Sequence, residues 1–199
     1  MRSIALILAS LSLVALSAPE SPTLTEKEEA TLVAGKVVVQ QDLPPAREKG
    51  VRARAVAEVD AAPDKVWEAL LDFQARVPEN KSLQTVEIYE DGWTGDILRR
   101  KARWDLQVFG TEIIFHNDYV LDRSQSYLEW NLDPDKENDL VFSWGSYQVL
   151  PSPIHPGKSR LVYVSESDSG RTLPKWLKKE VAEGSMEKLI AGIRDRAQK

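Results

Sequence analysis

The sequence predicts an α+β fold in which a curved antiparallel β-sheet wraps around a long C-terminal α-helix. A strand begins at Val51 and a helix follows it at Pro63. A run of roughly six strands comes next, and one amphipathic helix closes the chain. Strands joined by short links pair as an antiparallel meander, whose apolar face must be covered. Only the last helix is long enough to do so. A gap between a twisted sheet and this helix would form an internal apolar cavity.

Composition indicates one ordinary domain and argues against several partners. The chain has 199 residues, of which 29% are charged and 42% hydrophobic, a usual balance for a globular protein. Its net charge of −5 does not favour nucleic acid, whose phosphates need a basic surface. The sequence contains no cysteine, so disulfides and thiolate metal sites are excluded. We expect a monomer that binds no nucleic acid.

The first residues have the pattern of a secretory signal. Met1-Arg2 gives a positive start, an apolar run extends from Ile4 to Leu16, and Ala15-Leu16-Ser17 places small residues at a cleavage site. The apolar run is too short to anchor the chain comfortably in a bilayer. An uncleaved amphipathic start or a buried helix is the alternative. We therefore predict a signal peptide at residues 1–17 and an exported protein, either periplasmic or secreted.

Residues 18–50 are predicted to form an N-terminal arm that packs on the domain of residues 51–199. In the arm, Thr25-Glu26-Lys27-Glu28 matches a capping box and predicts a short helix to about Ala34. The β-branched run Val37–Val39 predicts a short strand.

The domain begins with a strand at Val51–Val59, whose alternation predicts one buried face. Pro63 is well placed to open the helix that carries Val66 and Phe73. Further strands are predicted at Val86–Tyr89, Ile97–Phe109, Ile113–Leu121, Leu128–Leu132, Leu140–Leu150 and Leu161–Val164. An apolar stripe predicts the closing helix and consists of Leu177, Val181, Met186, Leu189, Ile190 and Ile193.

Three stretches of the domain resemble one known family. They are Val59–Phe73, Ser146–Pro151 and Gly170–Leu177, and their order and spacing are similar to START-like (SRPBCC, helix-grip) domains. The polyketide-cyclase and coenzyme-Q-binding branch is the most similar. The resemblance implies a helix-grip fold whose cavity under the last helix binds a lipid, quinone, sterol, hopanoid-like compound or polyketide. In Gln74–Asn80 this chain keeps the family's proline but lacks the aromatic residues that often flank it.

Five residues are candidates for contact with a ligand. Arg100 and Trp104 share one face of a strand, and Asn117 and Tyr119 share one face of the next. If these faces point inward, Arg100 and Asn117 would hold a carboxylate, carbonyl or quinone oxygen. The alternative is that Arg100 lies near a sheet edge and extends to water. Trp104 and Trp144 are expected at the centre of the sheet, facing the last helix.

No catalytic or metal-binding arrangement stands out. His116 is expected to point outward from its strand, and His155 lies in a proline-rich loop. Neither has metal ligands at the usual spacing, so we predict no metal site. The sequence also lacks the glycine-rich phosphate-binding motifs, and no cofactor is predicted.

The leading hypothesis is therefore an exported binding protein that carries or shields a hydrophobic small molecule. An enzyme, such as a cyclase or dehydratase using Tyr119, Arg100 or a buried carboxylate in the same cavity, is the alternative. A third possibility is an interaction domain with a filled interior. Lys175, Lys178 and Lys179 form a basic cluster that would allow transient contact with an anionic membrane, although a solvated helix face is the better explanation.

Overall fold

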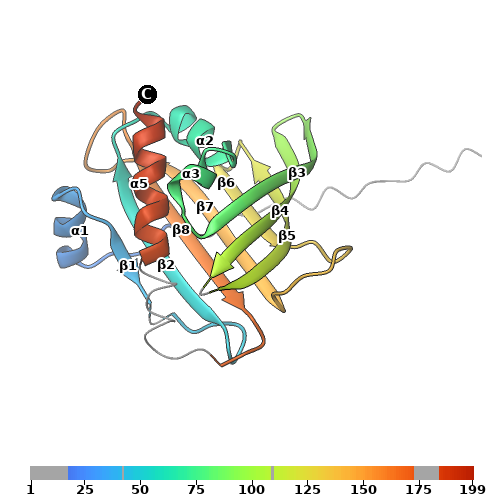
Figure 1. The fold of residues 1–199 in the computed structure, drawn as a ribbon. Coiled ribbons are helices and arrows are strands. Elements are labelled where there is room, and N and C mark those ends of the chain that lie inside the picture. The colour runs from blue at the N-terminus through green and yellow to red at the C-terminus, as the bar shows by residue number, and fades with distance from the viewer. Residues whose placement is uncertain (1–17, 42, 109, 173–183) are drawn as a thin grey trace, which may run out of the picture.

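A single antiparallel sheet organises the protein (Figure 1). The computed structural model describes residues 18–41, 43–108, 110–172 and 184–199. The sheet has eight strands in the order β1-β2-β8-β7-β6-β5-β4-β3. The strands are β1 (Val38–Gln40), β2 (Val51–Val59), β3 (Leu83–Thr94), β4 (Ile97–Val108), β5 (Thr111–Asp122), β6 (Tyr127–Leu132), β7 (Phe142–Pro151) and β8 (Ser159–Asp168). The described helices are α1 (Glu26–Val33), α2 (Pro63–Leu71), α3 (Arg76–Glu79) and α5 (Ser185–Ala197).

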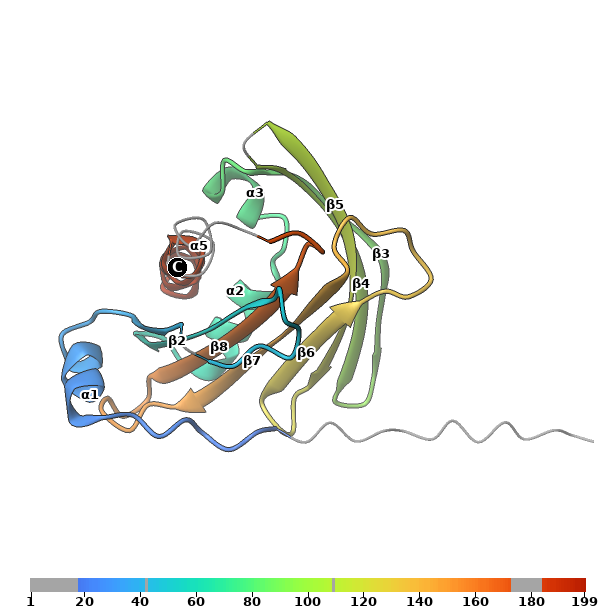
Figure 2. The ribbon, with the colours of Figure 1, turned by 90° about the horizontal axis from the view of Figure 1, so that it is seen from below.

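The predicted fold class is confirmed. The sheet is curved and unclosed, and Figure 2 shows α2, α3 and α5 on its concave side. From α5, Met186, Ile190 and Ile193 are buried in the same core as the inner residues of β2. The N-terminal part of the predicted last helix, with Leu177 and Val181, lies outside the described residues, as does Phe109. None of the described helices combines the length and the apolar character needed to span a bilayer.

Strand β2 is buried on both faces, whereas its sequence pattern predicted only one. Ala53, Ala55 and Ala57 face the helices, and these small side chains allow a close approach of the core. On the opposite face Val56 is also fully buried. The reason is the N-terminal arm, which covers this part of the convex face.

Apolar packing and the sheet hold the arm in place. The predicted capping box at Thr25 and Glu28 is present and starts α1. Leu32 of α1 and Val38 of β1 pack on Val56 of β2 and on Val162 and Val164 of β8. Strand β1 pairs with β2, so the arm adds an edge strand to the sheet. Together these contacts exclude water from the outer face of β2 and β8.

Charged groups reinforce the arm. Arg160 of β8 donates to Glu29 of α1 at 2.8 Å and to Glu58 of β2 at 2.6 Å. The buried carboxylate of Glu166 accepts backbone N–H bonds from Ala46 at 2.7 Å and Arg47 at 3.1 Å. Hydrogen bonds to a charged partner in a buried setting are stronger than exposed ones. They fix where the arm enters the domain.

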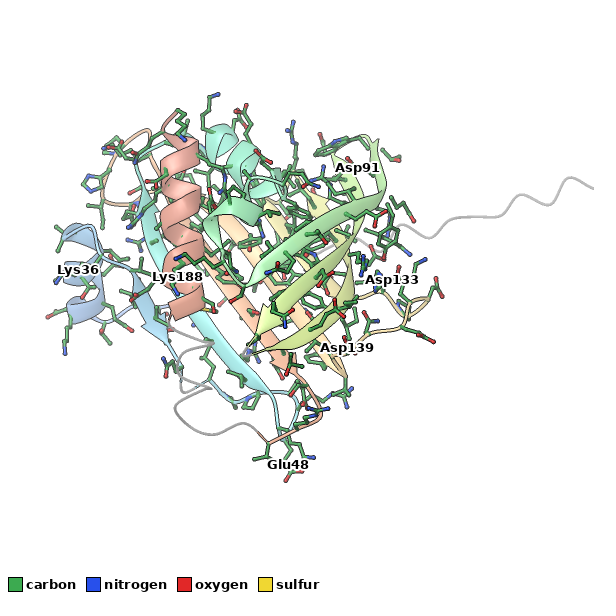
Figure 3. All side chains as sticks on the ribbon, in the orientation of Figure 1. Lys36, Glu48, Asp91, Asp133, Asp139 and Lys188 are labelled. Atoms are coloured by element: carbon green, nitrogen blue, oxygen red, sulfur yellow. The ribbon has the colours of Figure 1, made fainter. Side chains whose placement is uncertain are left out.

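A second polar cluster lies on the convex face of β3, β4 and β5. Tyr89 donates to Asp133 at 2.8 Å, and the ammonium of Lys101 lies 3.3 Å from the same carboxylate. Asp133 and Asp139 belong to the link between β6 and β7 (Figure 3). Asp139 accepts the N–H of Ile114 at 2.7 Å, which ties this link to the end of β5.

Removal of the Leu32 side chain tests how much the arm contributes to stability. Leu32 is 1% exposed and its neighbour Val33 is 60% exposed. We expect Leu32→Ala to lower the free energy of unfolding by about 3 kcal/mol, because it leaves a cavity between arm and sheet. Val33→Ala is the matched control and should change it by less than about 0.5 kcal/mol. Urea denaturation followed by circular dichroism measures both, and equal effects would show that the arm is not packed as described.

The cluster around Lys101 predicts opposite acid responses for two aspartates. Burial would raise the pKa of Asp133, but the hydrogen bonds from Tyr89, the Asp135 N–H and Lys101 outweigh it and leave that pKa lowered. Burial raises the pKa of Asp118. The ionised Asp133 thus stabilises the fold at pH values above the pKa of an aspartate in the unfolded chain, about 3.9. This stability is lost as the pH falls below that pKa towards the lower pKa of the folded state. Protonation of Asp118, by contrast, adds stability as the pH falls towards about 3.9.

Unfolding measured between neutral and acid pH checks this difference. Asp133→Asn should lose less stability than the wild type below about pH 4. Asp118→Asn should lose more stability than the wild type between neutral pH and about pH 4, because it lacks the stability that the wild type gains when Asp118 is protonated. Parallel pH profiles for the two variants would contradict the assignment.

Candidate functional site

Aromatic side chains form a continuous layer on the concave face of the sheet. The layer consists of Phe73, which follows α2, and Trp104, Tyr119, Trp130, Tyr147 and Tyr163, one from each of the strands β4 to β8. Adjacent ring centroids lie 4.8 to 6.1 Å apart. Gly145 leaves room for this layer, since a Cβ there would clash with the Trp130 ring and lie 2.6 Å from the Val164 carbonyl oxygen.

The guanidinium of Arg76 lies against this layer. Arg76 belongs to the short helix α3 and is only 8% exposed. Its Cζ atom is 4.9 Å from the ring centroid of Phe73, 5.6 Å from that of Trp104 and 5.8 Å from that of Tyr147. Nη2 donates to the Leu70 carbonyl at 2.6 Å. Nε has no hydrogen-bond partner among the described residues, and no described carboxylate forms an ion pair with this arginine.

Two further polar atoms of the same region lack partners. The indole N–H of Trp104 and Oδ1 of Asn117 are buried and bond to nothing within the described ranges. Asn117 does use its Nδ2 atom, which donates to the Tyr119 hydroxyl at 3.2 Å. An unsatisfied buried polar group costs about 1–3 kcal/mol, so native interiors contain few of them. Three in one region indicate a place where a bound molecule completes the hydrogen bonds.

The hydroxyls of Tyr119 and Tyr163 in the layer remain protonated at neutral pH. Burial raises the pKa of Tyr119, while the hydrogen bond from Asn117 and the charge of Arg76 act in the opposite direction. Burial also raises the pKa of Tyr163, again opposed by Arg76. Since the raised pKa values prevail, these hydroxyls can donate and accept hydrogen bonds but are poor bases.

Three of the five candidate residues from the sequence come together here. Trp104, Asn117 and Tyr119 all face the concave side, and both Trp104 and Tyr119 contact the ring of Phe73. Asn117 is 3% exposed. The strand phases predicted for β4 and β5 are therefore confirmed.

Arg100 is near this cluster but is already paired. Its Nε and Nη2 atoms donate to the two oxygens of Asp91, each at 3.0 Å, and Nη1 donates to the Leu71 carbonyl at 2.6 Å. The guanidinium covers the Phe73 ring, with Cζ 5.1 Å from its centroid. Arg100 thus ties α2 to the β3–β4 hairpin, and these contacts occupy the donors that the sequence-based hypothesis gave to a ligand.

The expectation that Trp144 faces the last helix is wrong. Trp144 packs with the arm cluster on the convex face, and Arg52 lies over its ring with Cζ 5.2 Å from the centroid. Side chains alternate along a strand, and Gly145 and Tyr147 of β7 belong to the concave face. Trp144 therefore has to point the other way.

Arg76 was missed as a site residue from the sequence. It lies in Gln74–Asn80, the stretch where this chain departs from the family pattern that it resembles. An arginine in a segment that usually carries aromatic residues was the available signal. Its position over the aromatic layer depends on α3, which only the tertiary structure places.

The histidines belong to other parts of the surface. His116 points outward on the convex face, as the sequence predicted, and its ring meets that of Tyr89 edge-on at 5.8 Å between centroids. His155 lines an outer groove of about 280 Å³ together with Lys158 and Arg194. In the part of the chain that the structure describes, no group of three His, Asp or Glu side chains is arranged to hold a metal ion. Lys175, Lys178 and Lys179 lie outside that part.

Solved structures with the same fold include enzymes and lipid-transfer proteins. The Zhui aromatase/cyclase from Streptomyces sp. R1128 aligns with a TM-score of 0.59 and 16% identity, over 75% of this chain and 94% of that one. The STAR-related lipid transfer protein from Xanthomonas axonopodis aligns with a TM-score of 0.60 and 14% identity, over 80% of this chain and 99% of that one. Human StAR-related lipid transfer protein 5 aligns with a TM-score of 0.59 and 16% identity, over 81% of this chain and 82% of that one. At these identities the likeness concerns the fold alone.

Sequence comparison places the domain in a family. No curated protein sequence matches the chain significantly. The model of one family, described as polyketide cyclase / dehydrase and lipid transport, matches residues 50–198. This match covers most of the chain and the whole of the curved sheet after β1. The chain therefore belongs to the polyketide cyclase / dehydrase and lipid transport family.

Proposed function

We propose that the protein is an exported carrier that binds a hydrophobic small molecule on the concave face of its sheet. One observation supports this most directly. The aromatic layer surrounds three buried polar atoms without partners, on Arg76, Trp104 and Asn117. An apolar surface with a few convergent polar groups is typical of small-molecule binding sites.

The packing of the concave face agrees with a bound molecule. Leu106, Phe115 and Tyr163 belong to the inner face but are only partly buried, while residues beside them such as Trp104 and Tyr119 are buried. A protein interior without a ligand is normally closely packed and fully hydrogen-bonded. Family membership adds to this, since the family includes lipid transport.

An enzyme acting in the same place is the second candidate. The protonated hydroxyl of Tyr119 lies beside the cationic Arg76, and this pair would polarise the carbonyl group of a substrate. Cyclisation or dehydration also needs a base. Apart from Asp91, which is paired with Arg100, the described inner-face positions of the strands hold no carboxylate and no histidine. A carrier is therefore the better supported of the two.

Export rests on the sequence of residues 1–17. With this segment removed, the arm would begin at Ala18 and lead directly into α1. We expect protein recovered from outside the cytoplasm to have a mass that corresponds to residues 18–199. Intact-mass measurement and N-terminal sequencing check this, and a retained Met1 in the exported protein would contradict it.

Native mass spectrometry tests the carrier function. Mature protein purified from its own host should contain an apolar molecule at a ratio of one to one, released by solvent extraction. Trp104→Ala should lose this molecule, because it removes both the ring and the N–H of the inner face. Trp144→Ala is the matched control, since this indole lies on the convex face, and it should retain the molecule. Purified protein without a ligand that also binds no member of a lipid panel would overturn the proposal.

A further inference from the structure

The buried guanidinium of Arg76 has no counterion among the described residues. A guanidinium stays protonated at all ordinary pH values, and burying such a charge without a partner is costly. Arg76 and Arg160 are equally buried, both at 8% exposed. Arg160 has two carboxylate partners, Glu29 and Glu58. Arg76 has three aromatic rings and one carbonyl oxygen, which compensate a positive charge less completely than a carboxylate.

Two N–H donors at this site, on Arg76 and Trp104, lack an acceptor among the described residues. Nε of Arg76 and Nε1 of Trp104 carry N–H groups and can only donate. Cζ of Arg76 lies 5.6 Å from the centroid of the Trp104 ring, and the rings of Trp104 and Tyr119 both contact Phe73. Three of the unpartnered buried atoms thus lie on the aromatic layer, and the others among the described residues belong to Gln41, Arg52, Glu58, Ser169 and Arg196.

Asn117 can join them as a donor. Its amide presents Oδ1 without a partner, while Nδ2 donates to Tyr119. A half-turn of the amide exchanges these two atoms with almost no change in shape. The Tyr119 hydroxyl then donates to Oδ1, and Nδ2 becomes available to a ligand. After that turn the site offers donors from Arg76, Trp104 and Asn117.

We propose that the ligand is a long-chain carboxylic acid whose carboxylate is bound by Arg76, Trp104 and Asn117. This inference rests on the proposed function and names the chemical class of its ligand. A carboxylate has two oxygens with room for about four hydrogen bonds, so it satisfies all three donors and supplies the missing negative charge. The aromatic layer contacts the apolar chain. An alcohol, ester or sterol with the same apolar surface leaves the charge of Arg76 without a counterion.

Binding of oleic acid and oleyl alcohol to delipidated mature protein compares two ligands with the same chain and different head groups. Titration calorimetry should give an affinity for oleate at least about tenfold higher than for the alcohol. Arg76→Met keeps an unbranched side chain without the charge and should reduce this preference to less than about twofold. Arg100→Met is the matched control, because Arg100 stacks on the same Phe73 ring but is paired with Asp91, and it should keep the preference.

A second measurement works on the wild type and needs no variant. Oleate labelled with ¹³C at the carboxyl carbon reports its own ionisation by NMR when bound. The carboxyl pKa should fall below that of the free acid, because a neighbouring cation and several N–H donors favour the charged form. This readout decides the question even if Arg76→Met does not fold, and Trp104→Phe, which deletes one donor, should weaken the shift.

The outcomes separate this inference from the function on which it rests. Equal affinities for the acid and the alcohol, with a bound pKa at or above the free value, would overturn the carboxylate assignment and leave the carrier intact. Binding of neutral lipids without binding of oleate would do the same. No binding of either probe or of any other apolar compound would overturn the carrier function itself.

Discussion

The rest of the structure depends on burying both faces of strand β2. Its inner alanines form the floor on which α5 packs, and its outer Val56 lies under the arm. Because β2 carries both β1 and β8, it links the arm to the main sheet. The arm and the last helix cover the apolar surface on the two faces of β2, and the removal of this surface from water stabilises the fold. The concave face extends from this strand across β8, β7 and β6 to β5 and β4.

Electrostatics differ between the two faces. On the convex side charges are matched, as with Arg160 between Glu29 and Glu58, and with Lys101 beside Asp133. On the concave side Arg76 lies among aromatic rings without a carboxylate from the described chain. A protein selected only for stability gains nothing from that arrangement, since an apolar side chain of similar size would pack there without the charge. The unmatched charge is best understood as half of an interaction that a ligand completes.

The position of α3 decides what the concave face can bind. Glu79 of α3 pairs with Arg196 of α5, and Arg196 also donates to the Ala69 carbonyl of α2 at 3.0 Å. These contacts hold the segment that carries Arg76 against both neighbouring helices. Neighbours with the same fold share little sequence with this chain. Differences in such short segments therefore offer a simple route to different ligands on one scaffold.

Sequence alone determined the fold class and the inner faces of β4 and β5. The twofold alternation of strands places Trp104, Asn117 and Tyr119 on one side, and local chemistry such as the Thr25 capping box starts α1. Tertiary structure decided which of the two arginines, Arg76 or Arg100, has a carboxylate partner among the described residues. Arg100 meets Asp91 across the β3–β4 hairpin, whereas Arg76 meets no carboxylate of the described chain. It also decided that Trp144 lies under the arm. These outcomes depend on contacts between distant segments, and periodicity within one strand or helix carries no information about them.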